Sequence, residues 1–240
     1  MGESFPISGQ IMSIIEIREL TFQWPSQTQP LLDVPSLVVN EGEKVFIKGP
    51  SGSGKSSLLS LLAGINEPTS GTVELLGRPF SNLKPTARDR FRADHIGYIF
   101  QMFNLLPYLS VIDNVLLPCR FSKLRKKHIG GGMYEQAKQL LSQLHLPDEC
   151  LERPISELSI GQQQRVAAAR ALIGKPKLLI ADEPTSALDH DNREAFIKLL
   201  MAECDQAGTT LLFVSHDQTL ESLFDRSICL NTINQAARRY

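Results

Sequence analysis

The chain has 240 residues, of which 42% are hydrophobic, and its formal net charge at pH 7 is −1. This near-neutral charge excludes a protein that is drawn to nucleic acid or anionic membrane by its overall charge, although local patches remain possible. No apolar run approaches the roughly 18 residues of a membrane-spanning helix, so another molecule would have to hold this chain at a membrane.

The N-terminal residues lack the basic and apolar regions of a secretory signal peptide. Residues 1–11 are polar and without pattern, and we expect a leader that is disordered or added by an expression vector. The cysteines are scattered and form no C-x-x-C pair, which indicates reduced thiols in a cytosolic protein; they are Cys119, Cys150, Cys204 and Cys229.

Short β-rich segments alternate with helical patterns along the rest of the chain. Strands are predicted at Ile14–Ile17, Lys44–Lys48, Val73–Leu76, Ile96–Phe100, Leu178–Ala181, Thr210–Ser215 and Ser227–Leu230. Helices are predicted at Lys55–Ala63, Tyr134–Leu144, Gln162–Ile173 and Asn192–Glu203. The runs Leu178–Ala181 and Leu211–Val214 are continuously apolar, as expected of parallel strands buried on both faces. The alternation of strands and helices predicts an α/β core.

The middle of the chain, residues 104–158, has a helical pattern instead. Three consecutive glycines, at positions 130–132, mark a loop between two of its helices, because glycine destabilises a helix interior. A basic run precedes them, at Lys123, Arg125, Lys126 and Lys127. Such a run can contact lipid headgroups or nucleic acid, but it is more often the solvated face of a helix, and we expect the latter.

A glycine-rich segment after the second predicted strand carries the clearest chemistry. It fits the pattern G-x-x-x-x-G-K-[ST] and consists of Gly49, Pro50, Ser51, Gly52, Ser53, Gly54, Lys55, Ser56 and Ser57. Small residues let the backbone N–H groups surround a polyphosphate, and the helix that begins at Lys55 favours an anion at its N-terminus. Lys55 is expected to reach the β- and γ-phosphates, and the Ser56 hydroxyl is expected to bind Mg²⁺. Because the segment lies between a strand and an apolar helix, it predicts a phosphate-binding loop rather than a plain turn.

Two carboxylates, Asp182 and Glu183, end the apolar strand at residues 178–181. The carboxyl end of a parallel strand faces the ligand crevice of such a sheet. Asp182 is therefore expected to hold Mg²⁺, directly or through water, and Glu183 to polarise an attacking water molecule. An acidic pair after a strand can also be a simple helix cap, but the phosphate loop favours the functional interpretation.

With these motifs the chain, from about residue 12 to 230, resembles the ATP-binding-cassette (ABC) ATPases. Gln101 matches the Q-loop glutamine, which links the γ-phosphate and metal to a helical subdomain. Ser159, Ile160, Gly161 and Gln162 resemble the signature sequence; Ser186, Ala187, Leu188 and Asp189 resemble the D-loop. His216 matches the switch histidine, and Trp24 the aromatic residue that stacks on adenine, with Phe22 as its competitor.

The resemblance implies a P-loop, RecA-like α/β core with a mixed sheet, an antiparallel β region near the N-terminus and a helical subdomain. The single ATPase domain would span residues 12–240, with its core at about 12–103 and 166–230 and its helical subdomain at about 104–165. ATP and Mg²⁺ would be bound between two ATPase subunits, identical or homologous, each phosphate loop facing the signature of the opposite subunit.

Segments around His95–Gln101, Asn104–Pro107 and Asn114–Pro118 are similar to the branch that includes lipoprotein-release, macrolide-export and cell-division ATPases. This branch implies a separate integral membrane subunit and a peripheral location on the cytoplasmic face of the cell membrane. Direct binding of nucleic acid is not expected. The alternatives are a soluble ABC ATPase that acts on nucleic acid or ribosomes, and a nucleotide-sensing module with weak hydrolysis.

One residue departs from the family pattern, since Ile160 stands where the signature has its first glycine. A β-branched residue is unfavourable wherever φ must be positive, and its side chain could crowd the γ-phosphate of the partner subunit. We therefore expect reduced or altered turnover; the alternative is that Ile160 points away from the nucleotide.

Overall fold

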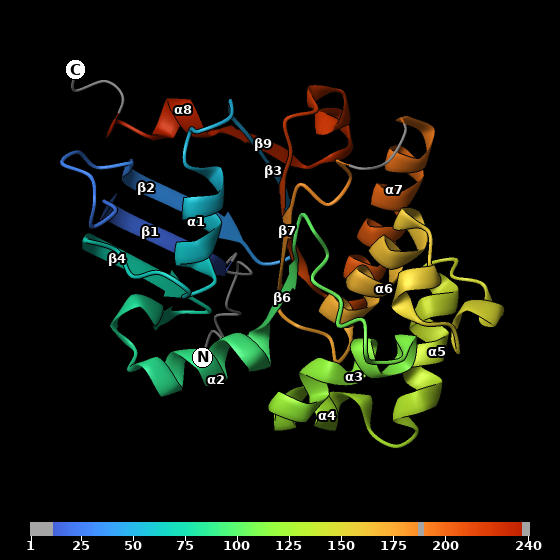
Figure 1. The fold of residues 1–240 in the computed structure, drawn as a ribbon. Coiled ribbons are helices and arrows are strands. Elements are labelled where there is room, and N and C mark those ends of the chain that lie inside the picture. Colours follow the sequence, from blue (N-terminus) through green and yellow to red (C-terminus); the bar gives the residue numbers. More distant parts are fainter. Residues whose placement is uncertain (1–11, 187–189, 237–240) are drawn as a thin grey trace, which may run out of the picture.

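The computed structural model describes residues 12–186 and 190–236, and its strands form two sheets (Figure 1). The first sheet is antiparallel, in the order β2-β1-β4-β5, and is formed by β1 (Ser13–Phe22), β2 (Leu32–Asn40), β4 (Ser70–Leu75) and β5 (Arg78–Pro79). This is the antiparallel region that was expected near the N-terminus.

The second sheet is parallel throughout, in the order β6-β7-β8-β3-β9. Its strands are β3 (Lys44–Lys48), β6 (Ile96–Ile99), β7 (Leu178–Asp182), β8 (Thr210–Val214) and β9 (Arg226–Cys229). The two strand directions of the expected mixed sheet are thus divided between two separate sheets.

The described helices fall into two groups. Around the two sheets lie α1 (Lys55–Leu62), α2 (Pro85–His95), α7 (His190–Ala207) and α8 (Leu230–Ile233). The helical region on one side of the parallel sheet contains α3 (Val111–Phe121), α4 (Lys123–Ile129), α5 (Met133–Gln143) and α6 (Ile160–Leu172) (Figure 1). Short 3-10 turns lie at Phe80–Asn82, Asp148–Cys150, Ile155–Glu157 and Gln218–Leu223. In the part of the chain that the structure describes, no helix is long and apolar enough to cross a membrane.

Successive residues of the parallel strands pack alternately into two hydrophobic cores, one on each face of the sheet. In β7, Leu178 and Ile180 pack in the core that contains α1 and the antiparallel sheet, whereas Leu179 and Ala181 pack in the core that contains α3, α5, α6 and α7. All four residues are buried, because both faces of the sheet are covered. The prediction of parallel strands buried on both faces is confirmed.

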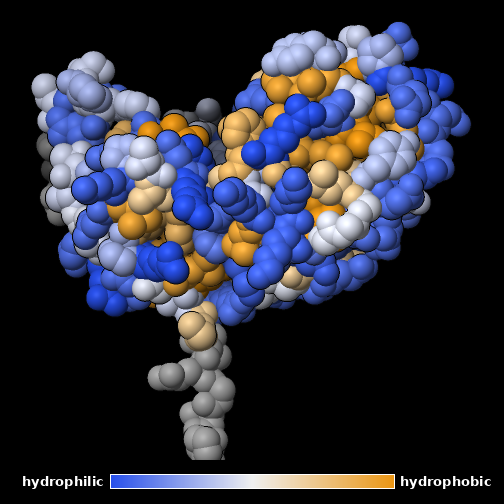
Figure 2. All heavy atoms as spheres, turned by 90° about the horizontal axis from the view of Figure 1, so that it is seen from below, coloured by the Kyte–Doolittle hydropathy of each residue, from blue (hydrophilic) through white to orange (hydrophobic). Residues whose placement is uncertain are grey.

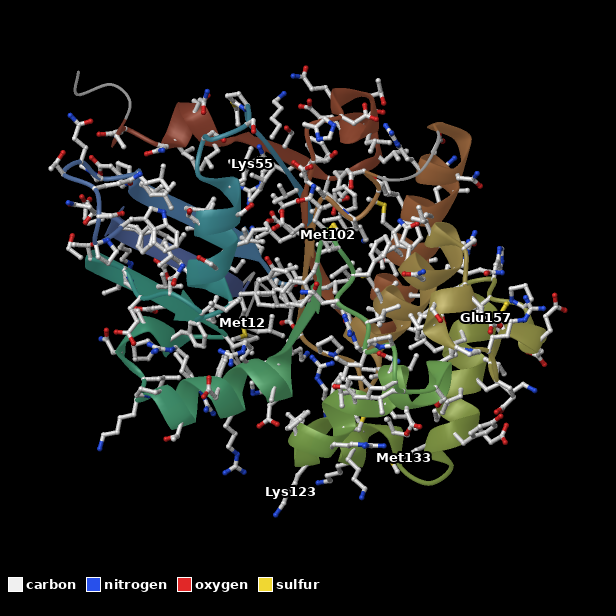
Figure 3. All side chains as sticks on the ribbon, viewed as in Figure 1. Met12, Lys55, Met102, Lys123, Met133 and Glu157 are labelled. Carbon is white, nitrogen blue, oxygen red and sulfur yellow. The ribbon has the colours of Figure 1, made fainter. Side chains whose placement is uncertain are left out.

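The glycine loop is also confirmed, because α4 ends at Ile129 and α5 begins at Met133. The prediction for the basic run is wrong at one position. Lys123, Lys126 and Lys127 are exposed, and Lys123 points away from the body of the protein (Figure 3), but Arg125 is only 1% exposed. Its guanidinium binds three backbone carbonyls of neighbouring elements, which is why a charged residue is tolerated inside.

Candidate functional site

The predicted site residues gather at the carboxyl-terminal edge of the parallel sheet. Since all of its strands point the same way, the segments that follow β3, β6, β7 and β8 emerge at this edge. These segments carry the phosphate loop, Gln101, the pair Asp182 and Glu183, and His216. Lys55 lies at the start of α1, beside the parallel sheet (Figure 3).

The phosphate loop wraps tightly between β3 and α1. Gly52 and Gly54 have φ values of 79° and 96°, a left-handed conformation that disfavours residues with a side chain. A Cβ atom on Gly49 would lie 2.7 Å from the Ser53 hydroxyl oxygen, so any other residue there would force the Ser53 side chain to move. No side chain caps the N-terminus of α1, and the buried Ser53 hydroxyl has no hydrogen-bond partner. Donors at the end of a helix, left without protein partners, are suited to an anionic ligand.

Lys55 lies across this loop instead of pointing into solvent. The residue is 8% exposed, and its Nζ atom donates hydrogen bonds to the carbonyl oxygens of Gly49 and Pro50, at 2.7 and 3.0 Å. The ammonium group is thereby held beside the backbone that would surround a polyphosphate. A point charge in this position can neutralise phosphate oxygens.

Asp182 lies against the first turn of α1. The Ser56 hydroxyl hydrogen-bonds its carboxylate, and so does the Tyr98 hydroxyl from β6. Burial and the neighbouring Glu183 carboxylate raise the pKa of Asp182 above its ordinary value, and the two hydrogen bonds and Lys55 only partly oppose this. Burial and the neighbouring Asp182 carboxylate raise the pKa of Tyr98. A buried carboxylate destabilised by a second one would gain from a bound cation.

Glu183 and His216 meet across the ends of β7 and β8. The His216 Nδ1 atom lies 3.2 Å from Oε2 of Glu183. Glu183 has a φ of 45°, and its N–H donates to the Val214 carbonyl at 3.0 Å, which fixes this left-handed conformation. Such a backbone costs about 1–3 kcal/mol and is often found at functional sites. The Glu183 side chain is 19% exposed and that of His216 is 63% exposed, so the pair faces solvent from the histidine side.

The signature residues form the N-terminus of α6. The Ser159 hydroxyl accepts a hydrogen bond from the Gln162 N–H at 3.2 Å, and Gln162 Oε1 accepts one from the Ser159 N–H at 2.9 Å. This capping box makes α6 begin at Ile160. The expectation of backbone strain at Ile160 is therefore wrong, because the first helical position has a negative φ that isoleucine adopts freely. Its side chain is 53% exposed, so crowding of the γ-phosphate bound by a partner subunit stays a prediction.

The signature does not lie at the phosphate loop of its own chain. Glu157, two residues before Ser159, lies among the helices on the far side of the parallel sheet from α1, whereas Lys55 lies beside that sheet on the α1 side (Figure 3). Gly161 and Ser186, of the signature and D-loop, are both accessible to solvent, and the rest of the D-loop, residues 187–189, lies outside the described residues.

Trp24 is better placed than Phe22 to contact a nucleotide base. Phe22 is 5% exposed and belongs to the core beside α1, whereas Trp24 is 37% exposed. The two rings meet edge to face, with centroids 5.0 Å apart. Phe22 thus supports the Trp24 ring from behind and leaves part of it accessible.

Sequence reasoning missed two residues that position the site. Tyr98 hydrogen-bonds Asp182, and Gln164 of α6 is buried and donates to the Pro184 carbonyl at 2.9 Å. Gln164 thereby attaches the signature helix to the segment directly after Glu183. The sequence signal for Tyr98 was its place in β6, three residues before Gln101; Gln164 gave no signal, since a glutamine in a helix is usually exposed.

Comparisons with known proteins identify the family of the chain. The family model for ABC transporters matches residues 32–186. An uncharacterized ABC transporter ATP-binding protein, YbbA of Escherichia coli K12, is 43% identical over 198 residues, which cover 82% of this chain and 84% of YbbA. The lipoprotein-releasing system ATP-binding protein LolD of Psychrobacter arcticus is 39% identical over 220 residues, 92% of this chain and 95% of LolD.

A solved structure extends the similarity to a nucleotide-bound state. The ATP-binding cassette MJ0796, in a dimeric post-hydrolysis structure with ADP and Pi, superposes with a TM-score of 0.79 at 33% sequence identity. The match covers 90% of this chain and 93% of MJ0796.

Proposed function

The chain belongs to the ABC transporter family of ATP-binding proteins, and on that premise we propose how its residues bind and hydrolyse ATP for a membrane partner. It is an ATP-binding and ATP-hydrolysing subunit of an ABC transporter. The observation that carries the residue assignment is the convergence of Lys55, Asp182, Glu183 and His216 on one edge of the parallel sheet.

ATP would bind with its phosphates in the loop Gly49–Ser57 and its adenine ring on Trp24. The loop supplies backbone N–H donors, the start of α1 and the Lys55 ammonium group. Trp24 stands on the segment after β1, where its exposed ring can stack on the base. In this arrangement Lys55 exchanges its hydrogen bonds to the loop carbonyls for phosphate oxygens.

The residues present fit a bound Mg²⁺. Mg²⁺ prefers hard oxygen ligands and usually combines one or two protein oxygens with substrate phosphates and water. Ser56 and Asp182 offer a hydroxyl and a carboxylate in mutual contact, and Gln101 emerges from the neighbouring strand β6. Elsewhere in the described residues, no group of three or more histidine, cysteine, aspartate or glutamate side chains could form a cage for a metal. When bound, the ion supplies neutralisation of the phosphate charge.

Glu183 is proposed as the general base. Its side chain is 19% exposed, and next to Asp182 it would lie beside the γ-phosphate rather than on the metal. A carboxylate that accepts a proton from water at this point makes the water a better nucleophile. His216, in contact with Glu183, would orient the carboxylate and hold the γ-phosphate, while Lys55 balances the charge that develops on the phosphoryl oxygens.

A second subunit would complete each site. The capped N-terminus of α6 carries Ser159, Ile160 and Gly161, and Glu157, just before it, lies on the other side of the parallel sheet from Lys55 (Figure 3). An anion at that helix end would be stabilised by the N–H groups of the first turn and the helix dipole. A second copy, or a homologue, would place its phosphate loop there. The dimeric MJ0796 structure with ADP and Pi supports this arrangement.

The membrane partner would dock in a groove of about 1080 Å³ between α2, α3, α4 and β6. The groove lies on the side of the molecule seen in Figure 2, where hydrophobic residues are visible among hydrophilic ones. Phe121, which lines it, is 73% exposed, and Met102 and Tyr108, on the segment after β6, are 81% and 77% exposed. Exposed aromatic side chains of this kind favour a protein interface. Docking there would hold the chain on the cytoplasmic face of the membrane.

The direct test is the ATPase rate of the purified chain with Mg²⁺ and with a chelator. The proposal predicts release of phosphate that depends on Mg²⁺ and is abolished in Lys55→Ala. Binding of ATP without any hydrolysis, alone or with the membrane partner, would instead support the nucleotide-sensing alternative.

A further inference from the structure

Two buried arginines line the groove, and both attach the signature helix to the strand that leads to Gln101. Arg125 of α4 is 1% exposed and Arg170 of α6 is 8% exposed, and both side chains form part of the groove lining. A buried guanidinium normally pairs with a carboxylate. In the described part of the chain, the hydrogen bonds of these two guanidinium groups all end on backbone carbonyl oxygens.

Arg125 joins the far end of the signature helix to the beginning of β6. Its Nη1 atom donates to the carbonyls of Ala171 and Ile173, each at 3.1 Å, and its Nη2 atom donates to the carbonyl of Ile96. Gly174 makes this possible, because a Cβ atom there would lie 2.5 Å from Cβ of Arg125. The last carbonyls of a helix have no intrahelical partner, so a cation is favoured at this end.

Arg170 joins the same helix to the other end of that segment. Its Nη1 atom donates to the Asn104 carbonyl at 2.7 Å, and its Nη2 atom donates to the Phe103 carbonyl. Phe103 and Asn104 have φ values of 58° and 50°, so the bonds hold a turn that neither residue prefers. This turn begins two residues after Gln101.

We propose that Arg125 and Arg170 are positioning residues for ATP hydrolysis, which make the signature helix and the Gln101 segment move as one unit. Residues 96–104 are held to α6 at both ends, and between them Gly97 lets β6 lie directly on that helix, since a Cβ atom there would be 2.3 Å from the Ala171 carbonyl. Both arginines line the groove, so a molecule bound there would touch them. Binding of such a molecule would therefore affect two sites at once. It would affect the signature, which contacts the nucleotide bound by the partner subunit, and Gln101, which lies at the nucleotide bound by its own chain.

Burial lowers the pKa of both guanidinium groups, that of Arg125 to about 10, yet they remain charged at neutral pH. The charge strengthens each hydrogen bond to a carbonyl. Lysine keeps the charge but has no planar fork to reach several carbonyls of different elements at once. Methionine keeps the length and loses every one of these bonds.

The inference rests on the proposed dimeric ATPase, and the experiment separates the two. In the full-length chain carrying Glu183→Gln, ATP-dependent dimerisation is measured by sedimentation, and binding of a fluorescent ATP analogue is measured at protein concentrations too low for dimers. Arg125→Met and Arg125→Lys are compared with Lys126→Met, which removes an exposed cation from the next position of the same helix. If Glu183→Gln itself forms no dimer with ATP, the proposed function is contradicted before the arginine is tested.

We expect Arg125→Met to weaken dimerisation at least tenfold and Arg125→Lys to weaken it less, while monomeric nucleotide binding stays within twofold. Lys126→Met should change neither. If Arg125→Met does not fold, the test rests on Arg125→Lys, whose dimerisation and monomeric nucleotide binding are compared with those of Lys126→Met. Unchanged dimerisation in a folded Arg125 variant, or a parallel loss of dimerisation and monomeric binding, overturns the inference.

Discussion

His216 Nδ1 and Glu183 Oε2 lie 3.2 Å apart, and they come from the ends of two adjacent parallel strands. The two residues are far apart in the sequence, but the register of β7 and β8 fixes their relative position in space, because Asp182 pairs with Val214. The Glu183 N–H also binds the Val214 carbonyl. The proposed base and its histidine are thus positioned by sheet geometry rather than by a flexible loop.

Replacement of His216 by alanine should lower kcat by about 10²- to 10³-fold, the range typical of losing one preorganised hydrogen-bonding group at a transition state. ATP binding should persist, because the phosphate loop and Lys55 do not depend on His216. Steady-state phosphate release and nucleotide titration check both parts. A His216→Ala variant with normal kcat would remove the histidine from the mechanism.

Replacement of Asp182 by asparagine should abolish hydrolysis but raise the melting temperature of the nucleotide-free protein at pH 7.5. The fold raises the pKa of Asp182, so the folded state binds its proton more tightly than the unfolded state does. The ionised carboxylate therefore destabilises the fold, and this cost is absent below the unfolded pKa and complete above the folded pKa. Asparagine removes the cost and can retain a hydrogen bond to Ser56.

Calorimetry at several pH values checks this. The difference in melting temperature between Asp182→Asn and the wild type should grow as the pH rises from about 4, the ordinary carboxyl range, to 7.5. A difference that is constant, or that favours the wild type at pH 7.5, contradicts the cause assigned to the pKa shift.

Replacement of Gly97 by alanine should destabilise the protein by about 1–3 kcal/mol, as overpacking of a close contact does. The added Cβ would lie 2.3 Å from the Ala171 carbonyl, and backbone on both sides would have to shift. Gly131→Ala is the matched control, since a Cβ atom there has nothing within 4 Å. Urea unfolding of both variants tests it, and equal stability of the two would contradict the contact.

Ile160→Gly should raise kcat, because we expect the exposed isoleucine side chain to crowd the partner's nucleotide. Backbone strain is excluded by the helical conformation at this residue. The free energy of unfolding of the monomer should fall by about 0.5–1 kcal/mol, because glycine is a poor helix residue. An ATPase rate and a dimer dissociation constant equal to those of the wild type would show that Ile160 points away from the nucleotide.

Much of the fold follows from local patterns. The strands β3, β7 and β8 are predicted to within a residue, because each contains a run of three or four apolar residues that are buried. Helix α2 was missed, since only Arg88 and Phe91 of it are buried and no apolar stripe marks it. Strand β2 was missed because it contains a proline, Pro35, which argues against a strand interior.

The candidate site was also predicted only where local sequence motifs mark its residues. Motifs placed the phosphate loop, Asp182, Glu183 and His216 at one edge because parallel strands deliver their ends there. The burial of Arg125 could not be predicted, because it depends on carbonyl groups of residues 96, 171 and 173, brought together only by tertiary packing. The sequence of a basic run does not show which of its residues is buried.

Glu183 is proposed as the base in the hydrolysis of ATP that is bound between two subunits. The decisive measurement is the molar mass of Glu183→Gln in ATP, determined by light scattering beside the wild type in ATP and in ADP. The variant should form a stable dimer with ATP but not with ADP, and it should release no phosphate. A monomeric variant in saturating ATP, or one that hydrolyses ATP at the wild-type rate, would contradict it.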